Sequence, residues 1–121
     1  MNYLKLALIG LALSGAGSAA AECTAPEMPT LPDGGTSTME EMLAGQKSVK
    51  DFQAANLEYM NCLEPQINAA AAKATTEEGS DEDRATLKAL EEAYNAAVSS
   101  EEELAGQFNT EIREYKAANP G

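Results

Sequence analysis

The chain has 121 residues, with 20 acidic and 8 basic side chains, a formal net charge of −12 and no histidine. Such a charge opposes binding to nucleic acid or to an anionic membrane surface, because the phosphate groups would repel it. It suits solubility, and it permits binding to cations or to basic proteins. Abundant alanine, with few aromatic residues and no tryptophan, favours long helices over a thick globular core.

Residues 1–21 are typical of a secretory signal peptide. A positive charge at Lys5 precedes an apolar run over residues 6–13, and small residues lead to an A-x-A cleavage site that ends at Ala21. Cleavage there leaves Glu22 as the first residue of the mature chain. The apolar run is too short to span a membrane, which takes roughly 20 residues. The sequence therefore predicts export to a bacterial periplasm, with secretion or a eukaryotic source as alternatives.

Lipidation of Cys23 is the alternative interpretation of this N-terminus. A lipobox needs a small residue directly before the cysteine, and Glu22 occupies that position. We therefore expect a soluble mature chain without a membrane span.

The chain has two cysteines, Cys23 and Cys62. In an exported protein they predict one disulfide, and only this pairing exists. A structural zinc site needs four ligands, which two thiolates cannot supply in a chain without histidine. The C-x-x-C spacing of a redox pair is also absent.

Residues 22–37 are predicted to form an extended strap, because prolines recur at every third residue, which is the period of a polyproline II helix. We expect the strap to run antiparallel along the following helix and to turn at residues 32–35, where glycines allow a positive φ. Two edges are expected to face protein and the third to face water. These edges are Cys23, Pro26, Pro29 and Pro32; Ala25, Met28 and Leu31; and Thr24, Glu27 and Thr30. The alternative is a P-x-x-P ligand for another domain.

Two long helices follow, over about 38–74 and about 81–118, joined by a short turn. Thr38 and Glu41 form a capping box at the start of the first helix, and Ser80 is the expected N-cap of the second. The sequence therefore predicts an all-α fold, a long antiparallel and coiled-coil-like helical hairpin, with the extended strap fixed to it by one disulfide.

Each helix presents one seam of mostly apolar residues at steps of three and four. The first seam is Met42, Val49, Phe52, Asn56, Met60, Leu63, Ile67, Ala70, Ala71 and Ala74. The second is Leu87, Leu90, Tyr94, Ala97, Val98, Glu101, Leu104, Ala105, Phe108, Ile112 and Tyr115, in which five residues follow a spacing of seven. Pro65 interrupts the first helix, and a kink is favoured over a break because the seam continues through Ile67.

Folding the hairpin about residue 78 sets Asn56 opposite Glu101, the one polar residue of each seam. We expect the two side chains to meet. A polar contact that sets the register is the favoured role, and a functional buried carboxylate is the alternative.

Candidate chemistry is sparse, so we expect neither enzymatic activity nor a cofactor. The serines have no visible base, and consecutive carboxylates such as residues 101–103 point in different directions on a helix. Thioethers at Met28, Met39 and Met42 are candidate Cu(I) ligands, although methionines more often fill gaps in a core.

Four short motifs carry a resemblance to a group of proteins. They are Cys23, Pro32-Asp33-Gly34, Tyr59-Met60-Asn61-Cys62 and Phe108-Asn109. With them the mature chain resembles uncharacterised small exported α-helical proteins of Gram-negative bacteria. The resemblance implies no activity.

The sequence as a whole predicts a non-enzymatic exported protein that acts through contacts with a protein partner or as a structural factor of the envelope. The partner can also be a second copy of the chain, because two hairpins can combine into a four-helix bundle as a homodimer. Metal handling through Met28, Met39 and Met42, or through the acidic face, is the alternative function.

Overall fold

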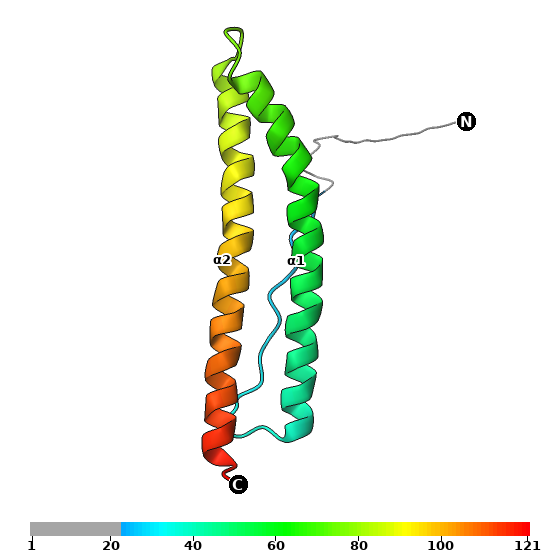
Figure 1. Ribbon diagram of the computed structural model, residues 1–121, viewed down its shortest axis with the longest axis vertical. Helices are drawn as coiled ribbons and strands as arrows, with labels where there is room; N and C mark the ends of the chain where they lie inside the picture. Colours follow the sequence, from blue (N-terminus) through cyan, green and yellow to red (C-terminus); the bar gives the residue numbers. More distant parts are fainter. Residues whose placement is uncertain (1–22) are drawn as a thin grey trace, which may run out of the picture.

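The structure, a computed structural model, describes residues 23–121, so the predicted signal peptide and its cleavage point between Ala21 and Glu22 lie outside the described residues. Two helices, α1 (Met39–Ala74) and α2 (Asp81–Ala118), run antiparallel and side by side along the long axis (Figure 1). Residues 23–121 contain no strand. The predicted all-α hairpin with a disulfide-fixed strap is confirmed.

Both helices begin at capping boxes. The Thr38 hydroxyl accepts a hydrogen bond from the Glu41 N–H at 3.1 Å, and the Glu41 carboxylate accepts one from the Thr38 N–H at 2.8 Å. Ser80 and Asp83 repeat the arrangement at 3.1 Å in each direction. These bonds satisfy N–H groups that a helix start otherwise leaves without partners. The helices therefore begin where the sequence predicts.

The core is a thin seam between the helices rather than a thick globular interior. Its most deeply buried apolar side chains are Leu63 of α1 and Leu104 of α2, which are 2% and 1% exposed. Burying a leucine side chain contributes about 1.5–3 kcal/mol. The other buried apolar residues are Met42, Val49, Phe52, Ala74, Leu90, Ala97 and Phe108.

The buried residues of α2, namely Leu90, Ala97, Leu104 and Phe108, all belong to the predicted seam. Within this seam, Leu90, Ala97 and Leu104 are buried more deeply than most of the residues spaced by seven from Leu87, and Val98 is 38% exposed. Of that predicted line, Phe108 near the C-terminal end is buried and Leu87 is only half-buried.

Pro65 lies inside a continuous α1 and is exposed. Figure 1 shows the last turns of α1 bending toward α2, so the helices converge at the hairpin tip. A proline inside a helix removes a hydrogen bond and clashes with the preceding turn, which bends the helix. The expected kink, rather than a break, is what the structure contains.

We call the end of the hairpin where α1 begins and α2 ends the foot. The strap, residues 23–37, runs between the two helices from α1 to α2 at the foot (Figure 1). At the foot, the Gly34 N–H donates to the Glu111 carboxylate at 2.8 Å. The chain then turns, with the Ser37 N–H bonded to the Asp33 carbonyl at 2.9 Å, and crosses to the start of α1. The strap is thus a third segment packed along the foot half of the hairpin.

Only one edge of the strap faces the helices, which corrects the prediction of two. Cys23 and the three prolines are half-buried, whereas Ala25 and Met28 are exposed and Leu31 alone of its edge packs against the core. The physical reason is that the strap lies over the space between two helices. An extended segment with three edges can insert only one of them there.

The turn does not need glycine for a positive φ. It needs Gly34 because the backbone of the turn lies very close to α2. Among the described residues, Gly121 is the glycine with positive φ. A Cβ on Gly34 would lie 1.8 Å from the Glu111 carbonyl oxygen, so no other residue fits there without movement. Gly45 of α1 is similar, because its Cβ would lie 2.6 Å from Pro32.

Candidate binding groove

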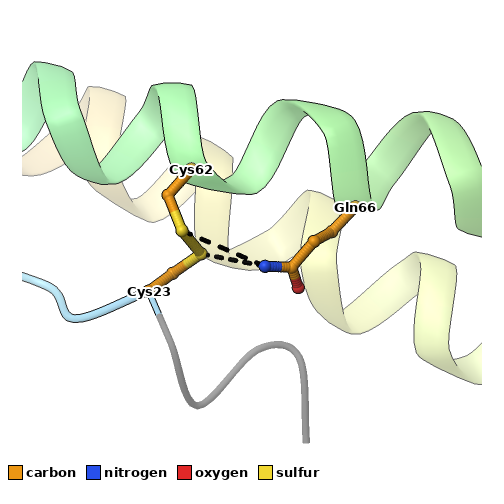
Figure 2. The surroundings of a disulfide bond; sticks show 3 residues. All are labelled: Cys23, Cys62 and Gln66. Carbon is orange, nitrogen blue, oxygen red and sulfur yellow. Dashed lines mark hydrogen bonds between the residues drawn. A yellow bond between two sulfur atoms is a disulfide. The ribbon is translucent and has the colours of Figure 1, made fainter.

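The predicted disulfide between Cys23 and Cys62 is present, with a Cα–Cα distance of 5.7 Å that is ordinary for such a bond. Figure 2 shows Gln66, one turn further along α1, reaching over it. The Gln66 amide donates to Cys23 Sγ at 3.0 Å. The N-terminal end of the strap is therefore fixed to α1 about two thirds of the way along that helix.

Between its two anchors the strap fills the groove that the helices form. Pro32 packs on Gly45 at the foot. Further up, a small cavity of about 120 Å³ remains beside the strap, lined among others by Pro26, Phe52 and Asn56. The foot half of the groove is thus occupied by the chain itself.

Asn56 and Glu101 meet in the seam, as the predicted register requires. Asn56 is 1% exposed, and its amide donates to the Ala97 carbonyl at 3.0 Å and to the Glu101 carboxylate at 3.1 Å. A slip of either helix would leave the buried Asn56 amide without these acceptors, which costs about 1–3 kcal/mol. The contact fixes how the helices are aligned.

Beyond the disulfide, toward the hairpin tip, no segment of residues 23–121 covers the groove. It has a volume of about 600 Å³, and we call it the tip groove. Its floor is apolar, formed by Leu63, Ala70 and Leu90. The remaining lining residues are Tyr59, Gln66, Ala69 and Lys73 of α1 and Glu82, Asp83, Thr86, Ala89 and Ala93 of α2.

The tip groove continues the groove that the strap fills. Tyr59 and Ala93 line both the small cavity beside the strap and the tip groove. The described part of the strap begins at this boundary, where Cys23 is bonded to Cys62. The same side of the hairpin is therefore covered by the strap at the foot and not at the tip.

Charge gathers at the tip end of this groove. Lys73 lies on the α1 wall, and Glu82 and Asp83 lie on the α2 wall. The hydrogen bond from the Ser80 backbone N–H is the main reason that the pKa of Asp83 is below its ordinary value, so this carboxylate stays ionised at neutral pH. Two carboxylates against one ammonium group leave this end of the groove negative.

The three candidate copper ligands have different surroundings. Met42 is 6% exposed within the core cluster, whereas Met28 and Met39 are 41% and 56% exposed. Met42 is thus a core residue, as methionines often are. The exposed pair remains a prediction from the sequence alone.

Three carboxylates converge where the strap reaches α2. Oxygen atoms of Asp33, Glu111 and Glu114 lie within 4.8 Å of one another. The neighbouring Glu111 charge is the main reason that the pKa of Glu114 is raised, with smaller effects of desolvation and of Asp33. The sequence could not reveal this cluster, because Asp33 and the helix residues meet only once the strap has crossed the hairpin.

The tip groove was also not predicted, although two signals pointed to it. A strap that is bonded to Cys62 and runs toward the start of α1 leaves the rest of α1 without cover from residues 23–37. Small residues also recur on both helices beyond that point, at Ala69, Ala70, Ala89 and Ala93. Small side chains on facing helices leave space between them.

Comparison of the chain with protein-family models, curated proteins and solved structures finds no match. The resemblance to exported helical proteins of Gram-negative bacteria therefore stays a prediction. No helix within residues 23–121 is long and apolar enough to cross a membrane. The molecule is a strapped two-helix hairpin with an open groove at its tip.

Proposed function

We propose that this protein is an exported, non-enzymatic binding protein that holds a partner protein in the tip groove. The observation that carries the proposal is the groove itself, which is filled by the strap at the foot and open over about 600 Å³ at the tip. A two-helix hairpin covers only one face of each helix, and a third segment extends that coverage. The strap provides this segment from Cys62 toward the start of α1.

Export is part of the same proposal, with the periplasm as the favoured compartment. Its support is the signal-peptide pattern of residues 1–21 together with the Cys23–Cys62 disulfide, a bond that persists in oxidising compartments.

The test is capture of a partner by the oxidised protein and by two matched variants. Ala89→Arg places a long charged side chain into the tip groove from an exposed position of α2. Ala54→Arg makes the same change at an exposed position of α1 that does not line the groove. We expect a stoichiometric partner with the wild type and with Ala54→Arg, and none with Ala89→Arg. Equal capture by all three proteins, or by none, would reject the proposal.

Self-association is a second form of protein contact that a specific observation favours. Met39, Leu43 and Leu57 of α1 are 56%, 56% and 55% exposed, and their spacing places them on one face of the helix. A homodimer that covers them would appear as a concentration-dependent mass in sedimentation equilibrium. A monomer at all concentrations would exclude it.

Cation handling remains the alternative function predicted from the sequence. Its carboxylate version would use Asp33, Glu111 and Glu114, but nothing besides the carboxylates themselves points to an ion there, so we propose no metal site. A methionine site would have only Met28 and Met39, because Met42 is a core residue. Calorimetric titration with Ca²⁺, Zn²⁺ and Cu(I) checks both versions.

A further inference from the structure

We infer that the tip groove binds an extended peptide segment of a partner protein, with prolines at every third residue and a basic side chain. This inference rests on the proposed function, because it names the chemistry of the partner that the groove would hold. Its support comes from the strap, from the backbone of the groove walls and from the charges at the tip.

The strap demonstrates what this groove accepts. Toward the foot, the extended strap inserts its edge of cysteine and prolines between the helices and leaves Ala25 and Met28 exposed. Pro26 lies by Phe52 and Tyr59, which line the same small cavity. The tip groove shares Tyr59 with that cavity and continues its path. A segment with the same spacing of prolines would extend the strap's interface toward the tip.

The groove walls favour this conformation over an added β-strand. Both walls are α-helices, whose backbone N–H and C=O groups are already bonded within each helix. They offer no sheet edge for strand addition. A polyproline II segment needs no backbone partners from its receptor, because its own backbone is solvated. Proline-rich peptides also bind grooves with aromatic walls, and Tyr59 supplies an aromatic ring here.

The length of the wall sets the length of the peptide. Tyr59, Gln66 and Lys73 line the α1 wall at intervals of seven residues. From the first to the last, α1 rises by about 21 Å at 1.5 Å per residue. A polyproline II segment of about seven residues spans the same distance at 3.1 Å per residue.

The charge at the tip selects the side chains of the peptide. Glu82 and the ionised Asp83 outnumber Lys73, within a chain of formal net charge −12. A basic side chain near the tip would be attracted both by the local carboxylates and by the field of the whole protein. An acidic peptide would be repelled by both.

The first test uses a peptide whose sequence is taken from the strap. The probe is a fluorescent synthetic nonapeptide with the sequence of residues 24–32 in which Glu27 is replaced by lysine. Its matched control keeps the glutamate. Fluorescence anisotropy is measured with the oxidised protein, in which the disulfide holds the strap in the foot half. We expect the lysine peptide to bind about tenfold more tightly than the glutamate peptide at low salt.

Variants of the protein then locate the binding. Ala89→Arg should weaken binding of the lysine peptide by about tenfold or more, while Ala54→Arg leaves it unchanged. Glu82→Lys should also weaken it, whereas Glu102→Lys, an exposed charge on α2 outside the groove, should have a smaller effect. Circular dichroism checks that every variant remains helical.

The outcomes separate this inference from the proposed function. Failure of both peptides to bind, or binding that Ala89→Arg does not change, overturns the inference. If a natural partner is still captured in a manner that depends on Ala89, the proposed function stands and the occupant is a helix or a folded surface. If neither peptide nor partner binds, both proposals fail. A change of mass in sedimentation that Ala89→Arg abolishes identifies a second copy as the occupant and also overturns the inference.

Discussion

Asn56 determines how the two helices line up. Its amide has two acceptors on α2, the Ala97 carbonyl and the Glu101 carboxylate, and the residue is 1% exposed. Apolar seams tolerate small shifts because their contacts are not directional, whereas a buried amide must find its acceptors. One polar residue in each seam is therefore enough to specify the alignment of two long helices.

Replacing Asn56 by aspartate should destabilise the protein strongly at neutral pH. The new carboxylate faces the Glu101 carboxylate and the Ala97 carbonyl, so it gains no donor and meets a like charge. We expect a loss of about 3 kcal/mol in the free energy of unfolding at pH 7, measured by urea denaturation. The loss should shrink at acid pH, where the new carboxyl is protonated. Asn61→Asp, an exposed position of α1, is the control and should be nearly neutral.

Gly34→Ala tests the contact between the strap turn and α2. An added Cβ would lie 1.8 Å from the Glu111 carbonyl, so the turn must move and the hydrogen bond from Gly34 to Glu111 must lengthen. We expect a loss of about 1–3 kcal/mol in the free energy of unfolding. Gly106→Ala is the matched control, since nothing lies within 4 Å of its Cβ. It should stabilise the helix by about 0.5–1 kcal/mol, and a similar result for Gly34→Ala would contradict the close approach.

The strap has little attachment of its own and depends on its anchors. The disulfide holds its N-terminal end, and Leu31, Pro32 and the bond from Gly34 hold the other end. Ala25 and Met28 are exposed. Each helix, by contrast, has its own caps and internal hydrogen bonds. The strap is thus the element whose position depends most on a single covalent bond.

Removing the disulfide should lower stability while leaving the helices in place. The bond links residues 39 apart in sequence, and in the chain-entropy model a loop of that length contributes about 4 kcal/mol. Urea denaturation of the oxidised protein and of the Cys23→Ser, Cys62→Ser form measures the difference. Far-ultraviolet circular dichroism of the double variant should retain the helical signal in the absence of denaturant. A difference below about 1 kcal/mol would mean that packing alone holds the strap.

The whole molecule carries a large excess of negative charge, with a formal net charge of −12. Such an excess keeps a protein soluble but opposes its compact state through self-repulsion. Folding adds to the repulsion where the strap brings Asp33 to Glu111 and Glu114. Stability should therefore depend on pH and on salt.

Glu114 determines the direction in which the stability changes with pH. Its pKa is raised, chiefly by the Glu111 charge, so the folded state favours the protonated form. The stabilising contribution is complete below the pKa that Glu114 has in the unfolded chain, and it is lost as the pH rises through the higher folded pKa. We therefore expect Glu114→Gln to melt at a higher temperature than the wild type at pH 7.

The difference between Glu114→Gln and the wild type should vanish under two conditions. At pH 3 the wild-type carboxyl is protonated, and at high salt the repulsion between exposed charges is screened. Thermal denaturation followed by circular dichroism measures both. Glu102→Gln, an exposed carboxylate of α2 outside the cluster, controls for the change in net charge. Equal melting temperatures of Glu114→Gln and the wild type across the pH range would contradict the prediction.

Local patterns in the chain were sufficient to predict the two helices, their start points and their alignment. Capping boxes at Thr38 and Ser80 act over four residues, and apolar periodicity acts over a few turns, so both can be recognised in the sequence. The pairing of Cys23 with Cys62 could be predicted without knowledge of the structure, because the chain has no other cysteines. The contact of Asn56 followed from the position of the turn and the nearly equal helix lengths.

The path of the strap and the open part of the groove, in contrast, depend on long-range packing. Which edge of the strap faces inward depends on the space between the two helices, and the shape of the groove beyond the strap depends on the bend in the last turns of α1 (Figure 1). The contact of Gly34 with Glu111 joins residues 77 apart. Such contacts arise from the balance of many packing interactions, and no local pattern in the chain encodes them. The tip groove is the space that remains when the disulfide ends the strap at Cys62.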